Sequence, residues 1–206
     1  MTNGHAPDDA SSRAAAQGRP DGRREQAILD AAAQLFDTSG YDRVGVDDIG
    51  ALVGISGPAI YRYFSGKDEI LAALFDAAMD RLLLLCGRLP EEPFEALDRL
   101  IAAHLEFAVQ DGALLSVYTR EERSLAEPAR RRLHRRQREH LGRWAAVLAR
   151  CFPDRPPDEH EVAAHAGIGM IHSIAQWPRS ARRRADPARL LRLLVTHGLA
   201  GLASDS

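Results

Sequence analysis

The chain is poor in cysteine and in long apolar runs, and each scarcity excludes a class of protein. Its 206 residues include two cysteines, Cys86 and Cys151, which form no CxxC pair, so neither a zinc ribbon nor a disulfide framework is indicated. The most apolar run, Leu82 to Cys86, is much shorter than the roughly 18 residues that a membrane span needs. We therefore expect no membrane partner and a cytoplasmic location.

An excess of charge of one sign is also lacking. The formal net charge is −2, and Lys67 is the only lysine. A protein that coats nucleic acid or an anionic membrane indiscriminately needs a net basic surface, so any nucleic-acid contact of this chain must be local. The N-terminal stretch contains Asp8 and Asp9 and no apolar segment, so we expect neither a secretory signal nor a membrane anchor. Residues 1–20 are expected to form a disordered arm.

Motifs of catalysis and cofactor binding are missing as well. The sequence contains no G-x-S-x-G, no Walker loop and no dinucleotide fingerprint. The stretch HEVAAH, from His160 to His165, resembles the zinc motif HExxH but is one residue too long, and imidazoles five positions apart point about 140° apart on a helix. We assign no metal site, no cofactor and no catalytic residue, and we do not expect an enzyme.

What the sequence does contain is helical periodicity along nearly its whole length. Apolar residues recur three and four positions apart, and no segment alternates like a strand. These patterns predict an all-α fold with an N-terminal three-helix unit at 21–66 and a larger helical bundle at 67–206. The expected helices are 23–39, 46–53, a short one from residue 56, 67–89, 93–110, 113–124, 127–151, 158–176 and 187–203.

The second and third helices have the layout of a helix-turn-helix. Gly54 occupies the position of a left-handed cap, Ser56 can serve as the next N-cap, and Pro58 falls in the first helical turn, where a missing amide hydrogen has no cost. Ile60 and Phe64 are four residues apart and so share a face, which we expect to be buried. The intervening Tyr-Arg-Tyr must then lie largely exposed.

An exposed string of this kind suits the surface of a DNA duplex. The major groove, about 12 Å wide, admits the end of one helix, while tyrosine hydroxyls, basic side chains and helix amides bind phosphates. Taken alone, the tetrapeptide Tyr-Arg-Tyr-Phe would also be explained by rings that are simply half-buried in a helical domain. The context favours DNA, and we predict contacts from Ser56, Gly57, Ala59, Tyr61, Arg62, Tyr63 and Lys67.

The stretch VDDIGALVGISGPAIYRYFSGKDEIL, from Val46 to Leu71, resembles the helix-turn-helix of the tetracycline-repressor (TetR) family of transcriptional regulators. Together with the upstream AILDAAAQLFDTSGYDRV, the resemblance covers about residues 23–75. The family usually has Thr where Gly45 stands and Ala where Gly50 and Val53 stand. The resemblance implies a ligand-responsive regulator, in most cases a repressor, that binds a palindromic operator as a homodimer. The alternative is a helical ligand carrier or small-molecule enzyme that kept this unit without its DNA role.

The bundle would then hold the dimer interface and an effector pocket. The last two helices are rich in small and apolar residues, and the family commonly pairs through a four-helix bundle of these helices. We predict interface contacts from His165, Gly169, His172, Leu191, Leu194 and Val195. An apolar or amphipathic small-molecule effector, of which an acyl-CoA is one candidate, would contact His104, Phe107, Tyr118, Trp144, Met170 and Trp177.

Six arginines lie between positions 130 and 138, and two interpretations of them stay open. One is a solvated helix face with ordinary charge pairing. The other is an anion site that holds the phosphates of a coenzyme A thioester at the mouth of the pocket.

Overall fold

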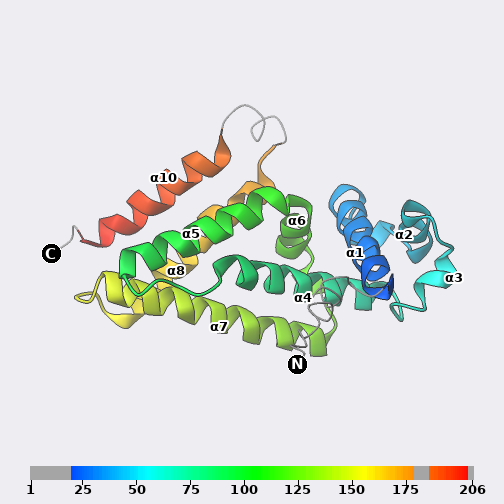
Figure 1. Ribbon diagram of the computed structural model, residues 1–206, viewed down its shortest axis with the longest axis horizontal. Helices are drawn as coiled ribbons and strands as arrows, with labels where there is room; N and C mark the ends of the chain where they lie inside the picture. Colours follow the sequence, from blue (N-terminus) through cyan, green and yellow to red (C-terminus); the bar gives the residue numbers. More distant parts are fainter. Residues whose placement is uncertain (1–19, 179–185, 204–206) are drawn as a thin grey trace, which may run out of the picture.

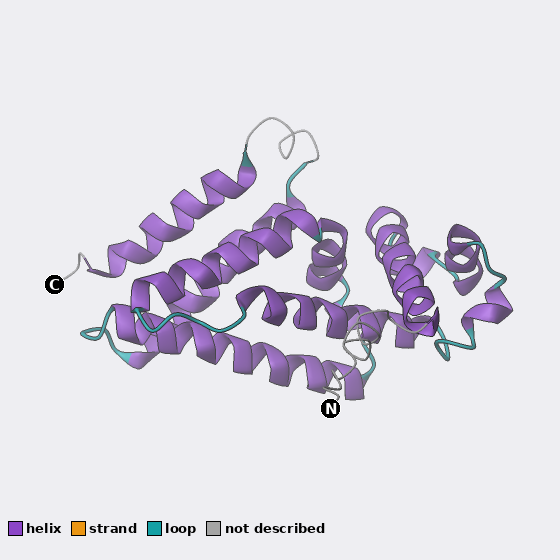
Figure 2. Cartoon of the chain, viewed as in Figure 1, coloured by secondary structure: helices purple, strands orange, loops and turns teal. Residues whose placement is uncertain are grey.

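The computed structural model describes residues 20–178 and 186–203, and every regular element in these ranges is a helix (Figures 1 and 2). The all-α prediction is confirmed for this part of the chain. The predicted disordered arm, residues 1–20, lies outside the described residues except for Pro20, which begins the first helix. No single described helix is long and apolar enough to cross a membrane. Among the described helices only Pro93–Gln110 and Gly112–Arg120 pass such a test as a pair, and they are bent by 96°.

Three helices and a single 3-10 turn build the N-terminal unit. The first helix packs against the second and the second against the third, and Phe36, Ile49, Ile60 and Phe64 are buried in their shared core. The unit ends at Gly66, the N-cap of the next helix. Its elements are α1 (Pro20–Ser39), η2 (Tyr41–Arg43), α2 (Val46–Val53) and α3 (Gly57–Ile60).

The larger part of the molecule is a bundle of longer helices. In Figure 1 the helix α4 leads from the N-terminal unit into this bundle, and α3 lies at the opposite end of the molecule from α10. The elements are α4 (Lys67–Cys86), α5 (Pro93–Gln110), α6 (Gly112–Arg120), η3 (Glu122–Ser124), α7 (Glu127–Cys151), α8 (Pro157–His172), η4 (Ser173–Gln176), α10 (Pro187–Ala200) and η5 (Gly201–Ala203).

Some predicted helices are shorter than their apolar patterns. The long connecting helix ends at Cys86 rather than at residue 89, because Gly87 adopts a positive φ of 57° that terminates it. The predicted helices 113–124 and 158–176 each end in a 3-10 turn, which apolar spacing alone does not distinguish from a further α-turn.

The N-terminal unit and the bundle share a hydrophobic core along α4. Phe75 and Met79 on α4 pack with Val117 of α6 and Leu133 of α7 in the same cluster that contains the helix-turn-helix core. On the surface, Arg120 donates to the Asp37 backbone carbonyl and carboxylate, both at 3.1 Å. A change in the bundle therefore has a packed route to the N-terminal unit.

Candidate DNA interface and ligand cavity

Two glycines set the turn between α2 and α3. Gly54 has φ 71°, the left-handed conformation that glycine adopts without steric cost. Gly50 lies so close to the turn that an added Cβ would be 2.8 Å from the backbone oxygen of Ile55. At the other end of α2 the Asp48 carboxylate accepts a hydrogen bond of 2.8 Å from the Gly45 amide. These contacts fix the angle at which α3 leaves the body of the unit.

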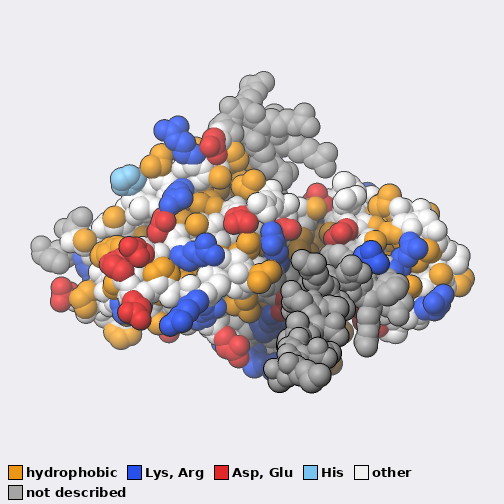
Figure 3. All heavy atoms as spheres, viewed as in Figure 1, with side chains coloured by type: hydrophobic (Ala, Val, Ile, Leu, Met, Phe, Trp, Pro, Cys, Tyr) orange, Lys and Arg blue, Asp and Glu red, His pale blue; other side chains and the backbone are white. Residues whose placement is uncertain are grey.

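Two of the three residues of the Tyr-Arg-Tyr string are exposed as their spacing predicts, whereas Tyr63 is half-buried against the core. Ile60 and Phe64 are 0% and 3% exposed, whereas Tyr61 is 56% exposed. Arg62 is also exposed, and its guanidinium carbon lies 5.9 Å from the ring centroid of the half-buried Tyr63. Figure 3 shows basic and apolar side chains together on the surface at this end of the molecule. The arrangement offers charge, hydroxyls and ring faces to one partner.

The N-terminus of α3 is less open than the sequence suggests. Ser56 is exposed and its hydroxyl makes no capping hydrogen bond, so it is free to meet a partner. Gly57 is buried against α2. A Cβ added there would lie 1.6 Å from Oδ1 of Asp47, so only glycine fits at this position. The small size of Gly57 thus serves the packing of α3 on α2. Ala59, half-buried, remains next to the exposed face.

Lys67 is held by its own protein. Its Nζ donates to the backbone carbonyl of Tyr41 at 3.0 Å and lies 4.2 Å from the centroid of the Tyr41 ring. The Tyr41 hydroxyl in turn donates to Asp68. An ammonium has three hydrogens, so the carbonyl contact leaves donors for a phosphate. Lys67 is therefore a brace between η2 and α4 that keeps N–H donors free for a further partner.

A cavity of about 500 Å³ opens inside the bundle. Residues of α4, α5, α6, α7 and α8 line it, and five of them are histidines. One wall is apolar, with Met79, Leu82, Leu141 and Ile168. The remaining lining residues are His104, Tyr118, Thr119, Glu122, His134, Gln137, Arg138, His140, His165 and His172.

Three of these imidazoles lie together: His104 and His140 are buried, and His172 is half-buried with its Nε2 enclosed. The Nε2 atoms of His104 and His140 lie 3.3 Å apart, and the His104 and His172 ring centroids lie 5.8 Å apart. Burial lowers the pKa of His140 and of His172 to about 4, and burial together with the other two imidazoles lowers the pKa of His104 well below its usual value. All three are therefore neutral at pH 7.

A polar chain borders the imidazoles. Gln137 donates to the Tyr118 hydroxyl at 2.9 Å, and that hydroxyl lies 3.3 Å from the sulfur of Met79. Burial raises the pKa of Tyr118 to about 12, so the phenol stays protonated. Nearby, His134 Nε2 lies 2.7 Å from the Glu122 carboxylate. The cavity thus combines an apolar wall with hydrogen-bonding groups, as sites for amphipathic small molecules do.

Comparison with known proteins decides the family. The model of the tetR family of bacterial regulatory proteins matches residues 28–74, and that of the tetracyclin repressor-like C-terminal domain matches residues 90–195. The chain belongs to the TetR family. The resemblance stated from the helix-turn-helix residues is thereby confirmed, and it extends to the bundle. TetR-family proteins are DNA-binding transcriptional regulators.

Individual relatives support the family at two levels. The chain is 41% identical over 64 residues to the transcriptional regulator EthR of Mycolicibacterium smegmatis, an alignment that covers 31% of this chain and only 30% of EthR. A solved tetR-family protein from Rhodococcus RHA1 is similar in fold, with a TM-score of 0.77, 19% identity, and 87% and 97% of the two chains covered. AibR, solved with isovaleryl coenzyme A and operator DNA, has a TM-score of 0.71 at 20% identity over 87% of this chain and 97% of that chain.

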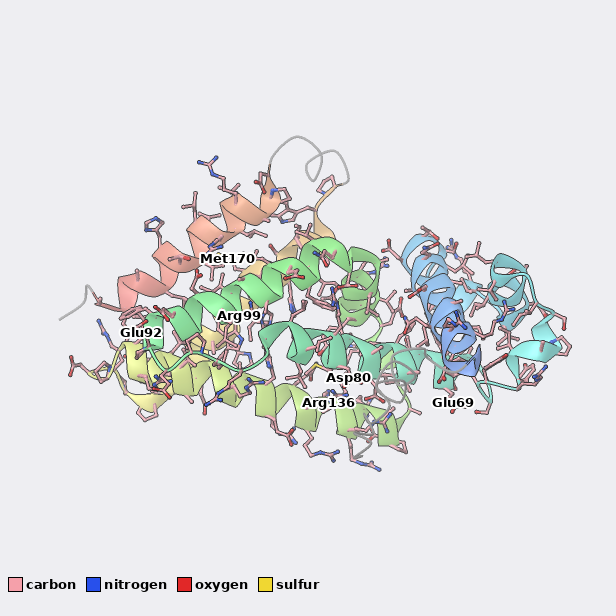
Figure 4. The ribbon with its side chains drawn as sticks, viewed as in Figure 1. Glu69, Asp80, Glu92, Arg99, Arg136 and Met170 are labelled. Atoms are coloured by element: carbon pink, nitrogen blue, oxygen red, sulfur yellow. The ribbon has the colours of Figure 1, made fainter. Side chains whose placement is uncertain are left out.

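The six residues predicted for the TetR effector pocket do not share one space. His104 and Tyr118 line the histidine cavity. Phe107 and Trp144 are buried in the bundle core, and Trp144 packs edge-on against His104 with centroids 5.0 Å apart. Met170, labelled in Figure 4, lines a separate groove of about 370 Å³ between α8 and α10. Trp177 packs against the same core after η4 and lines neither space.

The residues predicted for the dimer interface also divide. His165, Gly169 and Leu194 are exposed. Leu191 and Val195 are 1% and 0% exposed inside the protomer, since they lie on the face of α10 that packs against α5 and α8, and so they are not available to a partner. His172 faces the cavity. The outward face of these helices instead carries other apolar residues, namely Val162, Leu190 and Leu193.

Most of the arginine run is occupied by carboxylates within the chain. Arg132 makes a bidentate contact with Asp76, from Nη2 to Oδ2 at 2.6 Å and from Nε to Oδ1 at 3.2 Å, and Arg136 contacts both Asp76 and Asp80. Figure 4 shows Arg136 on α7 next to Asp80 on α4. Arg130 and Arg131 pair with Glu127 of their own helix. These pairs support the interpretation as a charge-paired helix face, and Arg138 is the member of the run that lines the cavity.

Sequence reasoning missed most of the histidines of the cavity. His165 and His172 lie seven positions apart on α8, with Ile168 between them, which is the spacing of a single helical face. That spacing could have been noticed. The meeting of His104 with His140 has no local signal, because the two residues are 36 positions apart on different helices.

Proposed function

We propose that the chain is a ligand-responsive transcriptional regulator of the cytoplasm that binds a palindromic DNA operator as a homodimer, acts as a repressor and is released by an amphipathic small molecule. It is not an enzyme. The observation that carries the proposal is the exposed Ser56, Tyr61 and Arg62 on a short helix whose opposite face, Ile60 and Phe64, is fixed in the core. Membership of the TetR family supports it.

DNA binding would use α3 in the major groove with phosphate contacts around it. Tyr61, Arg62 and Lys67 would bind phosphates, and Ser56, Ala59 and Tyr63 would lie nearest the bases and sugars. Gly57 would act by letting α3 pack closely on Asp47. With about 4 phosphates neutralised per chain, the dimer's log K would fall with log salt at a slope of about −7.

The dimer would form through the outer face of α8 and α10. Val162 is 67% exposed, and Leu190, Leu193 and Leu194 are each at least 44% exposed. The three leucines are three and four positions apart and so form one apolar stripe on α10. Gly169 is exposed on α8, and His165, also exposed, lies at the cavity as well. Exposure of such an apolar stripe to water is unfavourable in free energy, and the stripe suits an isologous contact with a second copy of the chain.

The effector would occupy the histidine cavity. Its apolar wall suits a short hydrocarbon chain, and Gln137, Tyr118 and His134 suit a polar head. Arg138 lines the cavity and would attract an anionic group such as the phosphates of an acyl-CoA. AibR, which is similar in fold, was solved with isovaleryl coenzyme A and operator DNA. Met79 and Leu82 of α4 line the cavity, so an occupant acts directly on the helix that begins at Lys67.

A binding assay with the DNA upstream of the protein's own gene tests the proposal. We expect the wild-type chain to shift this DNA, and Tyr61→Ala with Arg62→Ala to weaken binding by about 10-fold or more, since each operator holds two copies of the lost contacts. Phe94→Ala is the matched control, because Phe94 is also 56% exposed but lies on α5. Equal losses in both variants would refute the assignment of α3 to DNA.

The effector part has its own test. Isovaleryl and longer acyl-CoA thioesters, and the corresponding free acids, are added to the protein–DNA complex. Release by the thioester and not by the acid, weakened by Arg138→Gln, would support an acyl-CoA. Release by the acid alone would place the polar head at Gln137 and Tyr118, and release by neither would remove this class of effector.

A further inference from the structure

A second feature of the cavity region concerns a cysteine that the proposed effector does not use. Cys86 is the last residue of α4, His104 lies on α5 and His140 lies on α7. One ligand atom from each lies within 4.8 Å of the others, and all three side chains are buried. A thiol and two imidazoles are the donors that borderline-soft transition metals prefer, whereas magnesium and calcium prefer oxygen donors.

The distances suit a tetrahedral ion. With zinc–nitrogen bonds of 2.0 to 2.1 Å, two ligand nitrogens of a tetrahedron lie about 3.3 Å apart, and a zinc–sulfur bond of 2.3 Å places sulfur about 3.6 Å from nitrogen. The His104 and His140 Nε2 atoms are 3.3 Å apart. The thiol of Cys86 lies no more than 4.8 Å from the imidazole ligand atoms, so an approach of about 1 Å completes the geometry.

The surroundings of His104 orient it as metal-binding histidines are oriented. Its Nδ1 lies 3.1 Å from the Leu100 carbonyl oxygen and donates to it, which leaves the lone pair on Nε2, the atom that faces His140. Ligating histidines in proteins are held by such a donation to a backbone carbonyl. The imidazole therefore already has the required tautomer.

A fourth donor lies beside the group. Nε2 of His172 is buried and has no hydrogen-bond partner among the described residues, and its ring is adjacent to that of His104. A simple hydrogen bond between His104 and His140 explains their 3.3 Å distance but leaves Nε2 of His172 unsatisfied. An ion at the group would give this buried nitrogen a partner to which its lone pair donates, and a buried polar atom without a partner calls for such an explanation.

We propose that Cys86, His104 and His140 bind one zinc-class divalent ion per chain, and that Nε2 of His172, which lies outside this group, moves towards the ion as the fourth ligand. The two imidazoles line the cavity, so the ion would lie at its wall. Binding would transfer the thiol proton of Cys86 to solvent and form a metal–thiolate bond, with no change of oxidation state. Burial raises the pKa of the free Cys86 thiol, and the nearby Arg143 and Arg99 offset part of this rise. The site stands independently of the proposed DNA function.

Cobalt is the probe that tests the site on the full-length chain. The protein is prepared without an affinity tag, treated with a chelator and titrated with Co²⁺ under anaerobic conditions. We expect the visible bands of tetrahedral cobalt and a near-ultraviolet thiolate charge-transfer band, saturating at one equivalent, and displacement of both by one equivalent of Zn²⁺. No spectrum at one equivalent, or an octahedral one, would overturn the proposal.

Matched variants locate the ligands. Cys86→Ser should abolish the charge-transfer band, and His140→Gln should weaken binding by at least about 100-fold, more than the loss of an outer-shell partner costs. Cys151→Ser and His160→Gln are the controls, since both residues are buried and lie outside the group, His160 being bonded to the Phe152 carbonyl at 2.9 Å. Retention of the charge-transfer band in Cys86→Ser, or its loss in Cys151→Ser, would contradict the assignment.

A measurement on the wild-type chain covers the case in which a variant does not fold. X-ray absorption of the zinc-loaded protein should show one sulfur and two or three imidazole nitrogens around the metal. An environment of oxygen and nitrogen without sulfur would refute the site, because Cys86 supplies one sulfur whether or not His172 is the fourth ligand.

Discussion

The double role of Lys67 leads to a quantitative prediction for the variant Lys67→Gln. Nζ donates to the Tyr41 carbonyl and lies over the Tyr41 ring, and it retains donors for a phosphate. Loss of the charged hydrogen bond and the cation–π contact should lower the free energy of unfolding by about 1 to 3 kcal/mol. This structural cost does not depend on DNA, and chemical denaturation in urea measures it.

The salt dependence of DNA binding separates the two roles. One lost phosphate contact per chain changes the slope of log K against log salt by about 0.9, or about 1.8 for a dimer. Between about 50 and 200 mM salt, a fourfold change, the wild-type affinity should then fall about 12-fold further than that of the variant. Fluorescence anisotropy with a labelled operator at four salt concentrations gives both slopes.

The control removes the same charge elsewhere. Arg150→Gln lies at the C-terminal end of α7, at the opposite end of the molecule from α3 in Figure 1, and contacts the Glu91 carbonyl. Its slope should equal that of the wild type. If Lys67→Gln weakens binding while its slope also equals that of the wild type, Lys67 braces η2 and makes no phosphate contact, and the reasoning from its free donors fails.

Three further predictions concern the turn, the interface and the buried imidazoles. Gly54→Ala should cost about 1 to 2 kcal/mol of unfolding free energy, because φ at this position is 71°, whereas Gly66→Ala, at an extended φ of 168°, should cost less; equal costs measured in urea would contradict this. Leu193→Glu with Leu194→Glu should convert a dimer to a monomer in light scattering after gel filtration, while Leu84→Glu, at an exposed site on α4, should not. With chelator present, stability should fall as pH drops from about 6.5 towards 4, because the folded pKa of His140 is about 4 and the unfolded chain binds its proton first. His140 contributes about 3 kcal/mol of this fall, and the lowered pKa values of His104 and His172 add to it. The groups facing His140 are His104, His172 and Arg143, and His140→Gln should flatten this part of the urea-midpoint profile, whereas an unchanged profile would refute the assignment.

The sequence by itself determined the fold class, the helix-turn-helix and the family. These follow from local rules, since apolar spacing selects the helix, Gly54 fixes the turn, and Ile60 and Phe64 four positions apart bury one face and leave Tyr61 and Arg62 outside. The ends of two helices were predicted too far along the chain, because a 3-10 turn continues the apolar spacing of the α-helix before it.

Only the tertiary structure decided which residues share a space. Whether an apolar residue of α10 faces its own core or a partner depends on the rotation of the helix, and the structure places Leu191 inside and Leu194 outside. In the same way, a residue such as Trp144 is predicted as apolar and inward but belongs to the core rather than to the cavity wall. The three possible metal ligands come from different helices, namely Cys86, His104 and His140. They meet only when α4, α5 and α7 pack, because residues so far apart in sequence have no local interaction from which their contact could be predicted.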